Sequence, residues 1–148
     1  MARILILAYG NPLRGDDGLG WRAAEVLLND FAEGMEIRTC HQLLPEVAEP
    51  VSRADAIFFI DAARDGEPGE LRCRALTPEN SAARFTHQLS PAGILALSAE
   101  LYGHAPKAFL MSICGDSFGF SEKLSPAVAA SLPRLTGLVK ELVRHVRY

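Results

Sequence analysis

The chain has 148 residues, of which 49% are hydrophobic, and a formal net charge of −3. This length predicts a single domain spanning residues 1–148 that buries roughly 68–70% of its unfolded surface, and the hydrophobic content excludes a disordered chain. The small negative charge gives no support for binding nucleic acid. No apolar run approaches the roughly 20 residues of a membrane helix, so we expect no membrane partner.

The three cysteines indicate a reducing environment. Cys40, Cys73 and Cys114 are odd in number, far apart and without a C-x-x-C pair, which argues against a disulfide framework and a zinc knuckle. The N-terminal residues lead directly into a strand without a signal-peptide pattern. We therefore expect an intracellular, cytoplasmic protein.

The first strand and helix are predicted within the first 31 residues. An apolar run at residues 4–8 indicates a buried strand, and Gly10-Asn11-Pro12 indicates the turn that follows it. A helix is predicted over about 18–31, with Asp16 or Asp17 well placed as its N-cap. The apolar residues expected on its buried stripe, or beside it, are Trp21, Ala24, Leu27, Leu28 and Phe31.

Two further strands are predicted in the middle of the chain. The first covers residues 36–40 and precedes a short helix that begins near Pro45 and is limited by Pro50. The second, at residues 56–60, is entirely apolar and ends on Asp61, which is typical of a strand covered on both faces.

Residues 71–75 alternate in polarity, which indicates a half-exposed edge strand. Only the loop 64–69 separates them from the preceding strand, and so short a connection permits antiparallel pairing.

The remaining elements complete an α/β pattern. Ser90-Pro91 is an N-cap followed by proline at the first helical position, and Gly103 suits the C-terminal end of that helix. A strand is predicted at 108–114, and Ser125-Pro126 opens the last helix. The element order predicts a three-layer sandwich, with a mostly parallel five-stranded sheet, one antiparallel edge strand and helices on both faces.

Three polar residues are predicted at strand ends or in the loops just after them: Asp17, Asp61 and His87. The carboxyl ends of parallel strands share one edge of the sheet, where ligands bind in such folds. Two carboxylates and one imidazole suit a divalent transition metal such as nickel, zinc or manganese. Three protein ligands leave coordination positions open, as in catalytic sites.

Each candidate also has a structural interpretation, which the sequence leaves open. Asp17 can cap the first helix, Asp61 can cap a turn in the following loop, and His87 can be a solvated loop residue. His41 directly follows the strand at 36–40 and should lie at the same edge. It can be a fourth ligand, a substrate contact or a loop residue.

Other chemistries fit less well. The glycines between residues 10 and 20 lack the G-x-G-x-x-G spacing, and the acidic pair among them would repel a pyrophosphate. No G-x-S-x-G motif is present, which weighs against a serine hydrolase. Nothing near Cys114 in the sequence activates its thiol as a nucleophile.

Four segments, in order along the chain, resemble the motifs of one family, the hydrogenase maturation proteases. The segment from Gly10 to Gly20, GNPLRGDDGLG, resembles the N-terminal signature of that family. The other segments that carry the resemblance are Ile60-Asp61-Ala62 with Pro68-Gly69-Glu70, Thr86-His87-Gln88-Leu89, and Cys114-Gly115-Asp116 through Ser125-Pro126.

The resemblance implies an endopeptidase that trims the C-terminus of the large subunit of a nickel-iron hydrogenase. Asp17, Asp61 and His87 match the family's metal-binding acid, aspartate and histidine, and are the expected catalytic residues. The nickel is expected to arrive with the precursor, held by its cysteine thiolates, while zinc or cadmium can occupy the site in vitro. A carboxylate, Asp16 or Asp17, is expected to orient or deprotonate the attacking water.

One segment departs from the family pattern, and one alternative function remains open. After the second strand, relatives commonly have a small, glycine-containing stretch, whereas this chain has Cys40-His41-Gln42. The same three site residues would also suit a non-catalytic protein that senses nickel or binds the precursor as a maturation chaperone.

Overall fold

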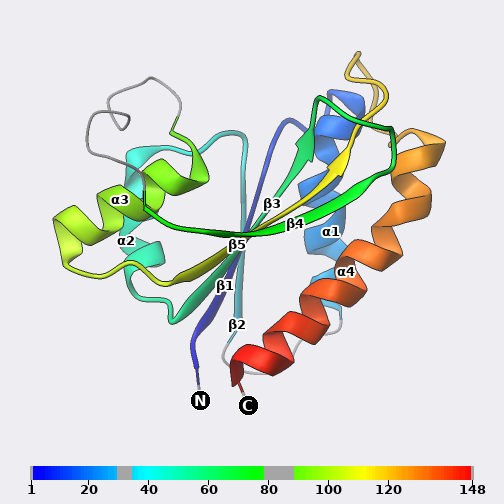
Figure 1. Cartoon of the computed structure of the whole chain (residues 1–148). Coiled ribbons are helices and arrows are strands. Elements are labelled where there is room, and N and C mark those ends of the chain that lie inside the picture. Colours follow the sequence, from blue (N-terminus) through cyan, green and yellow to red (C-terminus); the bar gives the residue numbers. More distant parts are fainter. Residues whose placement is uncertain (1, 30–34, 79–88, 148) are drawn as a thin grey trace.

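The computed structural model describes residues 2–29, 35–78 and 89–147. They include a five-stranded sheet with the strand order β2-β1-β3-β5-β4, covered by α2 and α3 on one face and by α1 and α4 on the other (Figure 1). Four strands are parallel and β4 is antiparallel, which confirms the predicted α/β fold. The strands are β1 (Ile4–Tyr9), β2 (Met35–Cys40), β3 (Ala56–Ala63), β4 (Leu71–Leu76) and β5 (Lys107–Cys114).

The helices connect the strands on both faces of the sheet. The α-helices are α1 (Leu19–Leu28), α2 (Ala48–Ser52), α3 (Pro91–Tyr102) and α4 (Pro126–Arg147), and short 3-10 helices precede α1 (Gly15–Gly18) and α2 (Pro45–Val47). The described helices include none that is long and apolar enough to cross a membrane.

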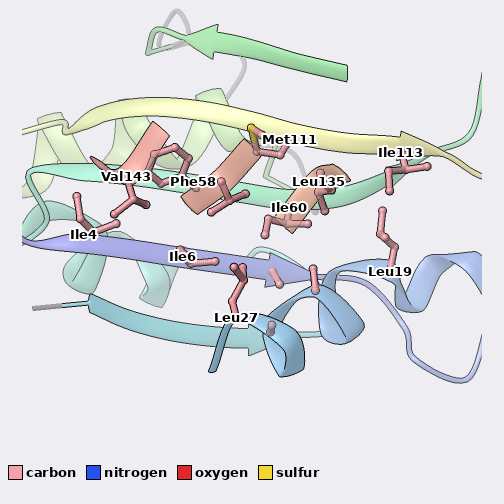
Figure 2. Close-up of a cluster of buried hydrophobic side chains, with 14 of the residues drawn as sticks. Ile4, Ile6, Leu19, Leu27, Phe58, Ile60, Met111, Ile113, Leu135 and Val143 are labelled. Carbon is pink, nitrogen blue, oxygen red and sulfur yellow. The ribbon is translucent and has the colours of Figure 1, made fainter. Parts of the chain in front are cut away.

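Burial on both faces explains the apolar runs of β1 and β3. Alternate residues of each strand enter opposite cores, because successive side chains of a strand point to opposite faces. Figure 2 shows the core on the α1 and α4 side, in which Phe58 and Ile60 of β3 lie in one cluster with Leu19 and Leu135. On the other face, Phe59 lies in a second core with residues of α2 and α3.

The predicted stripe of helix α1 is wrong for Leu28 and only half-buried at Trp21, and its last member, Phe31, lies outside the described residues. Leu28 is 64% exposed, whereas Leu19, Ala23 and Leu27 are fully buried. These three residues are spaced by four and therefore face the sheet together. The helix is also shorter than predicted, since it begins at Leu19 after a 3-10 turn and ends at Leu28.

Strand β4 runs antiparallel, as the short loop suggested, but its partner is β5 and not the preceding strand β3. The apolar strand β5, which has buried residues such as Met111 and Ile113, takes the interior position. The polar β4, with Arg72 and Arg74, takes the edge. This arrangement covers the apolar strand on both sides and leaves the charged side chains near solvent.

The ends of α3 confirm the predicted caps. The Ser90 hydroxyl accepts a hydrogen bond from the Gly93 N–H at 3.0 Å, and Gly103 adopts a left-handed conformation with φ of 76°. The cap at Ser90 fixes where the chain enters α3, directly beside the pocket described next.

Candidate functional site

The candidate site lies where the parallel strands end. Strands β3 and β5 pair three residues further than β1 does, so that Asp61 lies within β3, opposite Ser112 of β5, and not in the loop after it. Beyond Ile60, β3 no longer pairs with β1. The extension therefore places a carboxylate at the carboxyl edge of the sheet, where α/β folds bind ligands.

A phenol from the neighbouring strand fixes the Asp61 carboxylate. The Tyr9 hydroxyl, at the end of β1, donates a hydrogen bond of 2.5 Å to Asp61 Oδ2. Burial raises the pKa of Asp61 to about 6, even though the Tyr9 hydrogen bond lowers it, and the nearby charge of Asp17 raises it further. Burial and the Asp61 charge raise the pKa of Tyr9. The phenol therefore keeps its proton and holds the carboxylate in one orientation.

Asp17 belongs to the turn between β1 and α1. Its Oδ2 accepts a hydrogen bond of 2.7 Å from the Asn11 backbone N–H, and neither Asp16 nor Asp17 caps a helix end. The predicted capping role is therefore wrong for both residues. Gly10 allows this turn, because its φ of 139° suits glycine and its α-carbon lies against the Asp17 backbone carbonyl.

Gly10→Ala is expected to lower the free energy of unfolding by about 3 kcal/mol or more, because the added methyl group would overlap the Asp17 carbonyl oxygen at a strained φ. The matched change Gly137→Ala, in the interior of α4 with open space around it, is expected to raise stability by about 0.5–1 kcal/mol. Urea unfolding of both variants measures these effects. If Gly10→Ala changes the free energy of unfolding as little as Gly137→Ala does, the turn tolerates a side chain and the prediction is wrong.

A pocket of about 270 Å³ opens beside these residues. It is lined from the ends of β1 and β2, from the turn that holds Asp17 and from the loop after β3. The lining residues are Tyr9, Gly10, Asp17, His41, Gln42, Leu43, Arg64 and Leu89. Asp17, the Tyr9 side chain that holds Asp61, and His41 thus come together at one edge, as the sheet topology predicts.

His41 lies at the pocket wall against an aromatic ring. Its imidazole packs edge-to-face on Trp21, with ring centroids 5.5 Å apart, and the Trp21 indole N–H donates to the Gly10 carbonyl at 2.9 Å. Trp21 was predicted on the buried stripe of α1, but it is half-buried and supports the pocket. His41 is therefore a wall residue with an imidazole available to a ligand.

Asp16 has a structural role. Its side chain is fully buried and accepts four hydrogen bonds of 2.7–3.0 Å from Asp116 N–H, Ser117 N–H, and the N–H and hydroxyl of Ser125. Burial disfavours the charged form, but these hydrogen bonds outweigh it and lower the pKa of Asp16. Asp16 thus fastens the loop before α4 to the turn after β1, and the expectation that it could activate water is wrong.

The third predicted ligand, His87, lies outside the described residues. Within the described ranges, no three His, Cys, Asp or Glu side chains form a group that could hold a metal ion. The described part of the site therefore supplies two carboxylates, Asp17 and Asp61, close enough to interact electrostatically. The proposed third donor remains a prediction from the sequence.

Cys114 does not contribute a nucleophile to the pocket. Its thiol is fully buried and donates a hydrogen bond to Glu70 Oε2 at 3.5 Å. Burial and the Glu70 hydrogen bond raise its pKa, so that it stays a neutral thiol near neutral pH. This agrees with the prediction from the sequence.

The raised pKa of Asp61 predicts a pH dependence of stability in the metal-free chain. The folded state keeps the Asp61 proton up to a pH of about 6, whereas the ordinary value is 3.8, so stability falls as the pH rises from about 4 to about 6. Asp61→Asn is expected to remove this loss. Urea unfolding with a chelator present measures the stability difference between the variant and the wild type. A difference that stays constant between pH 4 and pH 7 would contradict the assignment.

Two pocket residues with polar side chains, Tyr9 and Arg64, were not predicted from the sequence as site residues. Tyr9 ends an otherwise apolar run, and this pattern predicts a core residue. Its hydroxyl at the last position of the strand could nevertheless have indicated a residue of the site. Arg64 lies in the loop directly after β3. Its place at the carboxyl edge follows from the same argument as that for Asp61.

Comparison with solved structures identifies the fold. The structure resembles the nickel-iron hydrogenase maturation protease HycI of Thermococcus kodakarensis, with a TM-score of 0.78 and 26% identity over 97% of this chain and 93% of that chain. The chain has the fold of the hydrogenase maturation proteases. The hydrogenase maturating endopeptidase HybD of E. coli gives the same TM-score and coverage at 23% identity. A hydrogenase 2 maturation peptidase of a Thaumarchaeota archaeon has a TM-score of 0.73 and 24% identity over 95% of this chain and 97% of that chain.

These similarities confirm the resemblance to the hydrogenase maturation proteases that the motifs predicted. They extend over 97% of this chain and 93% of each of those two chains. No protein-family model and no curated protein matches the sequence significantly.

Proposed function

We propose that this chain is a cytoplasmic endopeptidase that removes a C-terminal extension from the nickel-loaded precursor of a nickel-iron hydrogenase large subunit. One observation carries the proposal: Asp17 lines the pocket at the carboxyl edge of the sheet together with Tyr9, which donates a hydrogen bond to the neighbouring Asp61 carboxylate. These residues lie in a fold shared with solved hydrogenase maturation endopeptidases.

The donor set suits a nickel ion that is part of the substrate. Cysteine thiolates of the precursor hold the nickel, and Asp17 and Asp61 complete its coordination together with His87. Carboxylate oxygen and imidazole nitrogen are donors that divalent transition metals accept. Tyr9 orients Asp61 as hydrogen-bonded neighbours orient metal-binding carboxylates in general. Zinc or cadmium would take the same donors in vitro.

Recognition of the nickel would couple cleavage to loading. The nickel would fix the scissile peptide in the pocket and polarise its carbonyl. A water molecule would attack the carbonyl carbon, and the peptide C–N bond would break as the leaving nitrogen takes up a proton from that water. Because Asp16 is enclosed, Asp17 and Asp61 are the described carboxylates left to orient that water or take its proton.

The experiment that tests this function compares two forms of the precursor. The purified chain is incubated with nickel-loaded and with nickel-free large-subunit precursor, and mass spectrometry follows the loss of a C-terminal peptide. Cleavage of the loaded form alone is expected. His87→Ala is expected to abolish that cleavage, and cleavage by this variant at the wild-type rate would refute the nickel-reading role.

The alternative function predicts a different result in the same experiment. A non-catalytic nickel sensor or maturation chaperone would bind the loaded precursor without releasing a peptide. Co-elution of the two proteins, with the mass of the precursor unchanged, would favour that alternative over the peptidase.

A further inference from the structure

We propose that Arg64 is a specificity residue that binds a carboxylate group of the substrate peptide beside the Asp17–Asp61 site. The inference rests on the proposed function for the identity of the substrate as a peptide.

Arg64 lines the same pocket as Tyr9 and Asp17. Its guanidinium lies over the ring of Phe118, with 4.2 Å between Cζ and the ring centroid. Stacking covers one face of the guanidinium and leaves the N–H groups at its edge available. These N–H groups form the planar fork that binds carboxylates with two parallel hydrogen bonds.

The aromatic support of Arg64 is held in place. A side chain at Gly115 would overlap the Phe118 ring, so the glycine lets this ring pack closely on the backbone. The same loop is fastened by the hydrogen bonds that the Asp16 carboxylate accepts from residues on both sides of Phe118. A guanidinium on such a support loses little conformational freedom when it binds a ligand.

The charge of Arg64 is unbalanced within the described residues. None of their carboxylates forms an ion pair with it, although acids are plentiful nearby: Asp65 and Glu70 both pair with Arg72, at 3.1 Å each. An arginine that lines a pocket and forms no ion pair within the described residues is suited to an acid supplied by a ligand. In a peptide substrate this acid is the side chain of Asp or Glu, or a terminal carboxylate.

The chain contains a matched control, Arg14, whose aromatic support lies in the same loop as Phe118. Arg14 stacks over Phe120, with 4.0 Å between Cζ and the ring centroid, but Arg14 does not line the pocket. The two arginines therefore share charge, exposure and aromatic support, and differ in their access to the site.

Nuclear magnetic resonance of the ¹⁵N-labelled chain tests the proposal without cleavage or metal. The chain is titrated with the capped tripeptides acetyl-Gly-Glu-Gly-amide and acetyl-Gly-Gln-Gly-amide while the arginine Nε–H signals are followed, and Arg64→Met and Arg14→Met identify the two signals. The Glu peptide is expected to shift the Arg64 signal saturably, and the Gln peptide to shift it at least tenfold less. Equal responses to the two peptides, or a response confined to Arg14, would overturn the proposal.

A kinetic measurement extends the test to the precursor. Arg64→Met is expected to raise KM for nickel-loaded precursor by about 10- to 100-fold while kcat changes little, since a charge-assisted contact to substrate is lost. Arg64→Lys should restore part of the loss, and Arg14→Met should leave KM unchanged. A fall in kcat alone would contradict a binding role. A selective shift by the Glu peptide in a chain that cleaves no precursor would refute the peptidase function and leave the carboxylate site intact.

Discussion

Asp61→Asn is expected to lower the rate of precursor cleavage by at least about a hundredfold, and Tyr9→Phe by about 10- to 100-fold. Asp61 would contact the nickel directly, whereas Tyr9 acts through Asp61, and loss of a hydrogen-bonded neighbour of a metal ligand typically costs 10- to 100-fold in affinity or activity. Because Tyr9 acts only through its 2.5 Å hydrogen bond to Asp61, the loss in rate should be smaller for Tyr9→Phe than for Asp61→Asn. Initial rates of peptide release, followed by mass spectrometry, give both values.

Controls separate this effect from a loss of folding. Tyr102→Phe removes the hydroxyl of a tyrosine that is 51% exposed at the end of α3, and it should leave the rate unchanged. Cadmium binding, followed by calorimetry, should weaken in Asp61→Asn and, less strongly, in Tyr9→Phe. A Tyr9→Phe variant with wild-type activity and wild-type cadmium affinity would show that the hydrogen bond only supports the fold.

The fold could be predicted from the sequence wherever local pattern and tertiary packing agree. The all-apolar run at residues 56–60 is stable only as a strand that is buried on both faces. The caps at Ser90 and Gly103 are local sequence signals for the two ends of α3. The partner of β4 could not be predicted in this way. Strand β4 lies beside β5 because β5 is apolar and takes an interior position in the sheet. This choice depends on the packing of the whole sheet and not on the local sequence.

The candidate site could be predicted only in outline. Topology brings Asp17, Asp61 and His41 to one edge, and this follows from strand order alone. The different roles of Asp16 and Asp17 could not be read from two identical neighbouring residues. They are decided by the loop around Ser125, more than 100 residues away in the sequence, which binds one carboxylate and leaves the other at the pocket.

Asp16→Ala is expected to reduce the free energy of unfolding by about 3–5 kcal/mol. The change removes a fully buried carboxylate that accepts four hydrogen bonds, and it leaves the N–H groups of Asp116, Ser117 and Ser125 without that partner in a partly buried place. A loss of this size is a large part of the 5–15 kcal/mol that typically stabilises a folded protein. Urea unfolding followed by circular dichroism measures it.

Asp116→Asn provides the matched comparison, because the Asp116 side chain is exposed while its backbone N–H still donates to Asp16. It should change stability by no more than about 0.5 kcal/mol. Asp16→Ala should also broaden or shift the Arg64 Nε–H signal, because the loop that carries Phe118 loses its anchor. If Asp16→Ala unfolds at the same urea concentration as the wild type, the buried carboxylate does not hold this loop, and the rigid support inferred for Arg64 has no basis. If the variant is destabilised and the Arg64 signal moves, one buried acid next to the site both stabilises the fold and positions the residue that selects the substrate.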